Sequence, residues 1–227
     1  MRARLVTGSV EDPYRDPHRE AWEGEYARKG RIYGRVTRDL PWPGPGKRVL
    51  DVGCGDCRGL HCLGGPELRE SFACYVGIDH ARAALRSCRK ISSRAPGVHV
   101  VLGNGVRLPF RNGSFDMVFL VHVLGHVLLA DRMRMAREAA RVARMGGEVF
   151  VRVFSLSDFR AGRGEEVEEG TRVRGTGIPT HFFSRDEICD LFPDLSPVTL
   201  REVSWMMGVG KGQRKRAEIE GLFARSP

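Results

Sequence analysis

The chain has 227 residues, of which 41% are hydrophobic and 29% are charged, and its formal net charge is +9. This length suits one α/β domain with additions, and the composition excludes wholesale disorder and a core that depends on disulfides. No apolar run approaches the roughly 20 residues that span a bilayer, and the first residues form no apolar leader, so we expect a cytoplasmic protein without membrane contact.

The excess of positive charge would favour approach to polyanions such as RNA, although most of it is arginine, which can also reflect genome base composition. The six cysteines lack the paired framework of secreted proteins, and we expect them to be reduced thiols. They are Cys54, Cys57, Cys62, Cys74, Cys88 and Cys189. A thiolate metal site at the first three is the less favoured alternative, and we predict no metal.

Residues 1–47 are polar and arginine-rich and are predicted to form an N-terminal arm or lid, separated from the core by the proline- and glycine-rich segment 41–46. Trp22, Tyr26 and Tyr33 fall near helical spacing within this arm. They predict a short helix that either folds over the carboxyl edge of a sheet or simply packs on the core.

From residue 48 onward, short apolar runs alternate with longer amphipathic ones, which is typical of βα units around a parallel sheet. Strands are predicted at 48–52, 73–78, 98–102, 115–121 and 148–154. Helices are predicted at 58–70, 81–93 and 131–144, and the last is expected to end at Gly146 and Gly147.

An insertion is predicted at about 155–197 within a domain that spans 48–227. Its first part, 155–179, is rich in glycine and charge and reads as a long loop. Ser184 and Glu187 then form a capping-box pattern at the start of a helix. Segments 198–207 and 215–224 alternate as strands and should pair as an antiparallel hairpin.

Polar and glycine residues stand at the ends of the first three predicted strands. Asp51, Gly53, Cys54 and Gly55 form a turn in which the backbone can bend sharply and approach a ligand closely. Asp79 ends the second strand, where a carboxylate can accept hydrogen bonds from ribose hydroxyls or cap the following helix. These positions favour an adenosine-containing ligand.

Asn104, Gly105 and Val106 follow the third strand, where an amide side chain and free backbone groups can address an adenine edge. Leu108-Pro109-Phe110 and Ser114-Phe115-Asp116 then flank the turn at Asn112-Gly113, ahead of the fourth strand. Together with the D-x-G-C-G turn, these motifs resemble the class I S-adenosylmethionine-dependent methyltransferases of the type 11-like subgroup. The resemblance covers about residues 48–154 and, more loosely, the terminal hairpin.

The resemblance implies a Rossmann-like, doubly wound α/β fold whose mostly parallel seven-stranded sheet has an antiparallel last strand. It also implies that S-adenosylmethionine is the cofactor. The cofactor-binding residues it implies are Asp51, Gly53, Cys54, Gly55, Asp79, His80, Asn104, Gly105, Val106, Val121 and His122. Many members of the family have glycine where this chain has Cys57 and aspartate where it has Asn104; asparagine keeps a carbonyl acceptor.

The acceptor is not identified by the sequence, and no residue is obliged to be the catalyst, because methyl transfer can rest on proximity and alignment. Tyr26, Tyr33, His126 and His181 are candidate acceptor-binding residues. For His126 the alternative is a structural histidine, and for the His181 segment it is a hydrophobic anchor. A small-molecule acceptor is slightly favoured, with RNA, in particular tRNA, as the main alternative.

Several less favoured alternatives stay open. The acceptor could be a protein, and the chain could have an unknown protein partner. The chain could also be a non-catalytic S-adenosylmethionine-binding protein or a nicotinamide-dependent oxidoreductase. Two cations in the insertion, Arg172 and Arg174, could join Lys211, Arg214, Lys215 and Arg216 at the hairpin in facing an RNA backbone. The ordinary alternative for such a run is a solvated turn.

Overall fold

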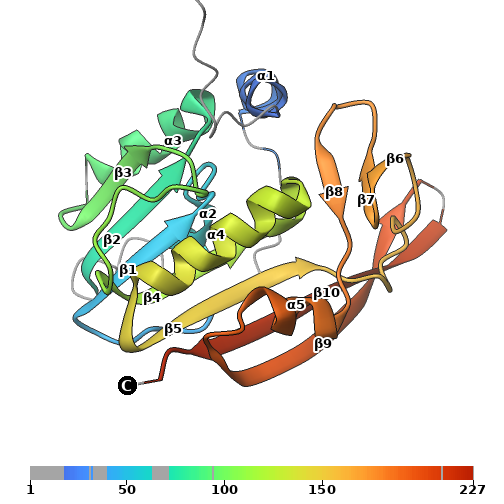
Figure 1. The fold of residues 1–227 in the computed structure, drawn as a ribbon. Coiled ribbons are helices and arrows are strands. Elements are labelled where there is room, and N and C mark those ends of the chain that lie inside the picture. Colours follow the sequence, from blue (N-terminus) through green and yellow to red (C-terminus); the bar gives the residue numbers. More distant parts are fainter. Residues whose placement is uncertain are drawn as a thin grey trace, which may run out of the picture.

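The computed structural model describes residues 18–30, 32, 40–62, 72–93, 95–210 and 212–226. Its centre is a seven-stranded sheet with the strand order β3-β2-β1-β4-β5-β10-β9 (Figure 1). Five strands run parallel: β1 (Lys47–Val52), β2 (Phe72–Asp79), β3 (Val98–Leu102), β4 (Phe115–Val121) and β5 (Ala143–Phe154).

The sheet is completed by the predicted terminal hairpin. Strand β10 (Gly212–Ala224) is antiparallel both to β5 and to β9 (Ser196–Val209), so the last strand lies inside the sheet and β9 forms its edge. The predicted α/β fold with a mostly parallel seven-stranded sheet and an antiparallel last strand is confirmed.

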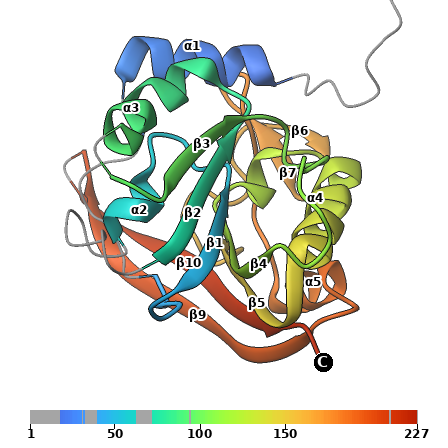
Figure 2. The same ribbon diagram turned by 90° about the vertical axis from the view of Figure 1, so that its left-hand side faces the viewer.

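Helices cover both faces of the sheet and one of its ends (Figures 1 and 2). Helices α2 (Arg58–Cys62) and α3 (Arg82–Ser92) lie on one face, and α4 (Leu129–Val142) and α5 (Arg185–Leu191) lie on the other. Helix α1 (Arg19–Lys29) crosses above α3 at the carboxyl ends of the strands, and the short 3-10 helix η2 (Leu124–His126) follows β4.

The sheet has an apolar core on each of its two faces, because side chains along the buried strands point alternately to one face and to the other. Val49 of β1 faces the layer that contains Leu85 of α3, whereas its neighbour Leu50 faces the layer that contains Met135 of α4. Because successive side chains of a strand point to opposite faces, a parallel strand covered on both sides is apolar throughout. This pattern explains why the apolar runs of the sequence located the strands.

Helix α4 ends earlier than predicted. The helix stops at Val142, and β5 begins at once and runs through Gly146 and Gly147, so the expectation of a helix ending at the glycine pair was wrong. The last helical carbonyls are bound by the Arg225 guanidinium, whose Nη1 donates to the carbonyl oxygens of residues 140, 141 and 143 at 2.9, 3.0 and 2.7 Å. A distant arginine therefore ends the helix.

The predicted long loop at 155–179 contains a second sheet. Strands β6 (Glu165–Glu168), β7 (Thr171–Val173) and β8 (Pro179–His181) pair antiparallel in the order β6-β7-β8. The strands are only three or four residues long and carry charge, so they lack the apolar alternation that reveals a strand in a sequence. The predicted cap of the next helix is present, because Glu187 N donates to Ser184 Oγ at 3.1 Å.

The expectation that all six cysteines are reduced thiols was wrong for one pair, since Cys57 and Cys88 form a disulfide. Parallel pairing of β1 with β2 brings the turn after β1 beside α3, although the two cysteines are 31 residues apart. Cys54 lies next to this pair, with the three sulfur atoms within 4.8 Å of one another. The side chain of Cys62 lies outside the described residues.

Two predictions on organisation stay predictions. The division into an arm at 1–47 and a domain at 48–227 has no independent test here, and the helix predicted at 58–70 is described only as far as Cys62. None of the helices within the described ranges is long and apolar enough to cross a membrane.

Candidate functional site

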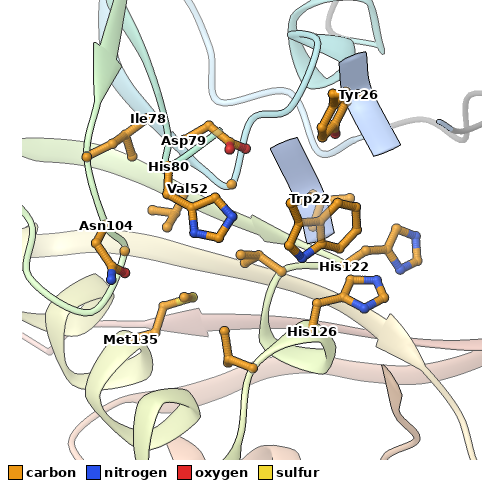
Figure 3. A pocket seen from close by; sticks show the side chains of 16 residues that line it. Trp22, Tyr26, Val52, Ile78, Asp79, His80, Asn104, His122, His126 and Met135 are labelled. Atoms are coloured by element: carbon orange, nitrogen blue, oxygen red, sulfur yellow. The ribbon is translucent and has the colours of Figure 1, made fainter. Parts of the chain in front are cut away.

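A pocket opens at the carboxyl edge of the sheet, where the order of the strands reverses between β1 and β4 (Figure 3). Parallel α/β sheets bind their ligands at such a switch point. The pocket holds about 640 Å³ of space, part of it open to solvent. Its walls come from α1, the ends of β1, β2, β3 and β4, η2 and α4. They comprise Trp22, Tyr26, Val52, Gly53, Ile78, Asp79, His80, Gly103, Asn104, Gly105, Val121, His122, Val123, His126, Val127 and Met135.

The glycine turn after β1 has the left-handed backbone that favours glycine, with φ of +70° at Gly53 and +56° at Gly55. A Cβ atom at Gly53 would lie 2.5 Å from Cγ2 of Val123, and one at Gly55 would collide with the Tyr26 hydroxyl. Both glycines thus permit close approach of the protein's own side chains. Of the two, Gly53 also lines the pocket.

Asp79 joins three parts of the site. One carboxylate oxygen accepts from Gly55 N at 2.9 Å and the other accepts from Ala81 N at 2.8 Å, while the residue also lines the pocket. Burial raises the pKa of Asp79, and the charge of His80 and the backbone donors counteract this rise. Asp79 therefore caps the start of α3, as one of the two predictions had it, and also lies in the pocket wall, as the other had it. Each carboxylate oxygen has a second lone pair that can accept a further hydrogen bond.

Asp51 lies behind the turn, outside the pocket wall. Its carboxylate accepts from the Tyr75 hydroxyl at 2.6 Å and lies against Gly59 of α2. Burial raises the pKa of Asp51 to about 7, the Tyr75 hydrogen bond lowers it, and the charge of Asp79 adds to the rise. Cys54 is also buried behind the turn, against Gly77 of β2.

The turn after β3 forms another part of the pocket wall. Asn104 and Gly105 line it, whereas Val106 is buried behind them. Asn104 Oδ1 accepts from Val106 N at 3.1 Å, so the amide also shapes its own turn. In Figure 3 the His80 ring lies between Asn104 and Trp22, in the middle of the pocket wall.

Helix α1 forms the roof. Trp22 and Tyr26 line the pocket and pack with Ala81, Ala83 and Ala84 at the start of α3. The Glu23 carboxylate accepts from Ala83 N at 3.1 Å, so an anion on α1 neutralises the positive end of α3. Tyr33 lies outside the described residues. The predicted arm helix thus covers the carboxyl edge of the sheet.

His122 follows β4 in a left-handed conformation, with φ of +59°, which is uncommon for a residue other than glycine. Its ring stacks on Phe154 with a centroid distance of 4.4 Å, and its Nε2 lies 3.3 Å from a carboxylate oxygen of the buried Glu218. Val121, at the end of β4, and the next residue, His122, both line the pocket. Both were predicted to bind the cofactor.

His126 is buried, and Trp22 of the roof meets its ring edge-on at a centroid distance of 5.0 Å. Its Nδ1 lies 2.8 Å from the carbonyl oxygen of Pro179, and a carbonyl can only accept, so Nδ1 carries the proton. Burial lowers the pKa of His126 to about 4, the hydrogen bond to Pro179 raises it, and the charges of His122 and Arg160 lower it further. At neutral pH the ring is therefore neutral, with its lone pair on Nε2.

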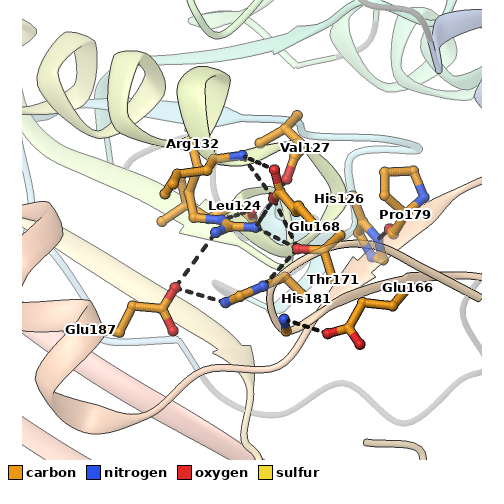
Figure 4. Close-up of polar contacts among 12 residues, drawn as sticks. Leu124, His126, Val127, Arg132, Glu166, Glu168, Thr171, Pro179, His181 and Glu187 are labelled. Atoms are coloured by element: carbon orange, nitrogen blue, oxygen red, sulfur yellow. Dashed lines mark hydrogen bonds and ion pairs between the residues drawn. The ribbon is translucent and has the colours of Figure 1, made fainter. Parts of the chain in front are cut away.

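His181 lies away from the pocket wall, in a polar network that holds the small sheet on the core (Figure 4). Its Nδ1 lies 2.7 Å from Thr171 Oγ1, and its Nε2 lies 2.7 Å from Glu187 Oε1. The centre of the network is Arg132 of α4, whose guanidinium donates to Thr171 Oγ1 at 3.2 Å and to Glu168 Oε1 at 3.3 Å.

The structure brings most of the predicted site residues together. Nine of them line the pocket: Tyr26, Gly53, Asp79, His80, Asn104, Gly105, Val121, His122 and His126. Asp51, Cys54, Gly55 and Val106 support the pocket from behind, and His181 supports the small sheet. Sequence reasoning did not select Trp22, Val52, Ile78, Gly103, Val123, Val127 and Met135, which also line it. Proximity of Trp22 to Tyr26 along one helix was the available signal.

Comparison with known proteins gives one family and a consistent fold. Residues 50–151 match the family model described as "Methyltransferase domain". A 27-O-demethylrifamycin SV methyltransferase from Amycolatopsis mediterranei is 30% identical over 169 residues, which are 70% of this chain and 58% of that protein. A Xenopus tropicalis tRNA (carboxymethyluridine(34)-5-O)-methyltransferase is 25% identical over 67% of this chain and 25% of its own length. The chain thus spans between a quarter and three fifths of these relatives.

Among solved structures, a SAM-dependent methyltransferase from Methanosarcina mazei superposes with a TM-score of 0.66. The match covers 83% of this chain and 99% of that one at 20% sequence identity, so it supports the fold alone.

Replacing Asp51 by asparagine should flatten the pH dependence of stability, because an amide oxygen can still accept the Tyr75 hydroxyl but cannot ionise. The pKa of Asp51 is about 7 in the folded protein and near 3.8 in the unfolded chain. Below about pH 4 the carboxyl is protonated in both states and does not change the free energy of unfolding, whereas between about pH 4 and pH 7 it ionises only in the unfolded chain and lowers that free energy progressively. The Asp51→Asn variant should match the parent at pH 4 and be more stable at pH 8, by at most about 4 kcal/mol.

Urea unfolding of both proteins across pH 4–8 measures this difference, with Asp131→Asn on α4 as the surface control. Parallel curves for Asp51→Asn and the parent would show that Asp51 ionises in the folded protein as easily as in the unfolded chain.

Arg132→Met should lower the free energy of unfolding by roughly 2–4 kcal/mol, because it removes the donor to two buried carbonyls and leaves Thr171 and Glu168 without it. The carbonyls belong to Leu124 and Val127, each 3.2 Å from the guanidinium. Denaturant unfolding measures the loss. Arg137→Met, an exposed change on the same helix, should cost within about 0.5 kcal/mol. Equal losses in the two variants would contradict a stabilising role for the network.

Proposed function

We propose that the chain, whose residues 50–151 match the methyltransferase family model, transfers a methyl group from S-adenosylmethionine to a small-molecule acceptor enclosed beneath α1. The observation that carries this proposal is the pocket itself. It joins the ends of four neighbouring parallel strands under a roof of two aromatic side chains, Trp22 and Tyr26.

The residues present suit the cofactor. Asp79 keeps acceptor capacity on both carboxylate oxygens after binding Gly55 N and Ala81 N, which suits the two hydroxyls of a ribose. Asn104 and Gly105 on one side and His80 nearby supply polar and planar groups for adenine. Gly53 exposes its backbone to the pocket, while the space that its Cβ atom would take is filled by Val123, which also lines the pocket.

When bound, S-adenosylmethionine supplies a methyl carbon on a positive sulfur that leaves as a neutral thioether. The chain's own residues align the acceptor and manage its proton. An acceptor atom that carries a proton would have to lose it on methylation, and a residue of the pocket would have to take up that proton. His126 lines the pocket, and a proton taken by its ring would bind Nε2, because Nδ1–H is committed to Pro179. Because burial holds the pKa of the ring near 4, His126 would act as a weak base that passes the proton on to solvent at neutral pH.

The roof favours a small acceptor. Trp22 lies against His126, and Tyr26 lies against Gly55, so α1 covers the edge that a large acceptor would have to approach. The similarity to a rifamycin methyltransferase, which by its name acts on a small molecule, supports the same direction.

RNA is the second candidate, favoured by the net charge of +9 and by the similarity to a tRNA methyltransferase. Two of the cations expected to follow a phosphate backbone have other partners. Arg172 pairs with Glu166 at 2.8 Å, and Arg216 pairs with Asp158 at 2.7 Å. Arg214 and Lys215 are exposed in β10, and Lys211 lies outside the described residues.

The test is incubation of the protein with methyl-labelled S-adenosylmethionine and an extract of the organism that encodes it, separated into small molecules, RNA and protein. Label in the small-molecule fraction supports the proposal. Label confined to RNA or to protein would contradict a small-molecule acceptor and identify RNA or protein as the acceptor. Binding of S-adenosylmethionine without any methyl transfer would identify a non-catalytic binding protein.

Asp79→Asn should weaken the binding of S-adenosylmethionine by about ten- to a hundred-fold, since hydrogen bonds to a charged acceptor contribute roughly 1.5–3 kcal/mol. Isothermal titration calorimetry measures the dissociation constant, with Asp131→Asn as the control. Because Asp79 also binds two backbone amides, the melting temperature is recorded without ligand. A drop in melting temperature with unchanged affinity would leave Asp79 a structural role only.

His126→Gln should reduce methyl transfer by roughly a hundred-fold while leaving the dissociation constant of S-adenosylmethionine unchanged, as expected for loss of a positioned base. The exposed His99→Gln change on β3 is the control. Nitrogen-15 NMR of the imidazole rings should show the proton of His126 on Nδ1 and a pKa near 4. A proton on Nε2 at neutral pH would rule out this base.

A further inference from the structure

Four arginines lie outside the pocket wall, and two of them, Arg160 and Arg216, lie over the ring of Phe154. We call Arg160, Arg163, Arg174 and Arg216 the arginine cluster. The first three come from the segment that joins β5 to the small sheet, and Arg216 comes from β10. A Cβ atom on Gly164 would lie 2.7 Å from Cγ of Arg174, so Arg174 lies beside the residue that follows Arg163. The turn after Arg174 reaches the roof, since a Cβ atom on Gly177 would lie 3.9 Å from Cβ of Ala21 on α1.

One buried carboxylate supports the cluster from below. Asp158 has a fully buried side chain and accepts from Nε of Arg160 at 2.8 Å and from Nε of Arg216 at 2.7 Å. It also accepts from the backbone N of Arg160 and of Ala217. Five donors thus share its two oxygens, and a single negative charge faces several positive ones.

Phe154 connects the cluster to the pocket. The Arg160 guanidinium lies over the Phe154 ring at 4.0 Å, and the same ring stacks with His122, which lines the pocket. The charge of Arg160 also contributes to the lowered pKa of His126. The positive charge of Arg160 therefore acts on His126 in the pocket wall.

Arg163 and Arg174 are the exposed members of the cluster. Partial burial of the guanidinium lowers the pKa of Arg174, and the positive charges of Arg160 and Arg163 lower it further, while Asp158 opposes this. Arginines held close together against their mutual repulsion are suited to bind an anion, because the planar guanidinium matches a carboxylate or a phosphate with two parallel hydrogen bonds.

We propose that the acceptor carries an anionic group, a carboxylate or a phosphate, which Arg163 and Arg174 bind while its nucleophilic atom lies beside His122 and His126. This inference rests on the proposed methyl transfer to a small molecule. It narrows the acceptor to an anion and assigns its recognition to residues outside the cofactor's part of the pocket.

The first test passes the small-molecule fraction of the extract over an anion exchanger at neutral pH before incubation with labelled S-adenosylmethionine. The acceptor should be found in the retained fraction. Phosphatase treatment of that fraction should abolish labelling if the anion is a phosphate, and conversion of carboxylates to amides should abolish it if the anion is a carboxylate. Label only in the unretained fraction overturns the inference and leaves the proposed function standing, whereas no labelled small molecule at all contradicts the proposed function.

The second test compares the double variant Arg163→Gln/Arg174→Gln with Arg137→Gln, an exposed arginine on α4. The double variant should lose about ten- to a hundred-fold of transfer while its S-adenosylmethionine affinity and melting temperature match the parent, since neither residue binds Asp158 directly. Arg137→Gln should retain full transfer. Equal transfer in the two variants would overturn the inference.

A binding measurement that needs no acceptor completes the design. Inorganic phosphate and acetate are titrated separately into protein labelled with nitrogen-15, and the arginine Nε–H resonances are followed. The resonances of Arg163 and Arg174 should shift with a saturable dependence on one of the anions, and the double variant should lose this response. Shifts that grow linearly, with the same size in the double variant, would mean that the cluster does not bind anions.

Discussion

The Asp79 carboxylate is the interaction on which the site depends. By accepting from Gly55 N and Ala81 N, it fixes the turn that leaves β1 relative to the start of α3, which the Cys57–Cys88 disulfide also ties to that turn. The positions of Gly53 and of the α1 roof follow from this arrangement, because Tyr26 packs against Gly55 and Glu23 binds the first turn of α3. Burial makes the charged carboxylate costly, and the two backbone donors offset part of that cost.

The opposite wall is set by Arg132 in a comparable way. Its buried guanidinium binds the carbonyls that precede α4 and reaches Glu168 and Thr171, so η2 and the small sheet take up one arrangement. Pro179 is thereby held where its carbonyl selects the tautomer of His126. A residue outside the pocket wall thus helps to determine which nitrogen of a pocket histidine can accept a proton.

The sequence predicted the parallel strands, the closing hairpin and most of the pocket, because buried strands are continuous apolar runs and the polar residues at their ends share one edge. It could not predict the end of α4, which depends on Arg225, a residue more than 80 positions away. The small sheet was missed because its strands are too short for periodicity. Gly55 was assigned to a ligand, whereas Tyr26 occupies the space beside it, and no local pattern could pair a turn with a helix from the arm. His181 was selected by residue type, and only tertiary contacts place it in the network.

The position of β10 inside the sheet has a consequence for how the chain is assembled during synthesis. Strand β5 can pair with β4 as soon as both have left the ribosome, but its other side stays an open edge until residues 212–224 emerge. Strand β9 likewise has no partner within the described sheet before then. The open edge of β5 therefore persists while the chain between Phe154 and Gly212 is made, whereas β9 ends only shortly before β10 begins; during this time the edge of β5 is vulnerable to pairing with other chains. Insertion of the last strand closes both edges in one step and places Arg225 on the end of α4, so that the final part of the sheet and the preceding helix are completed together.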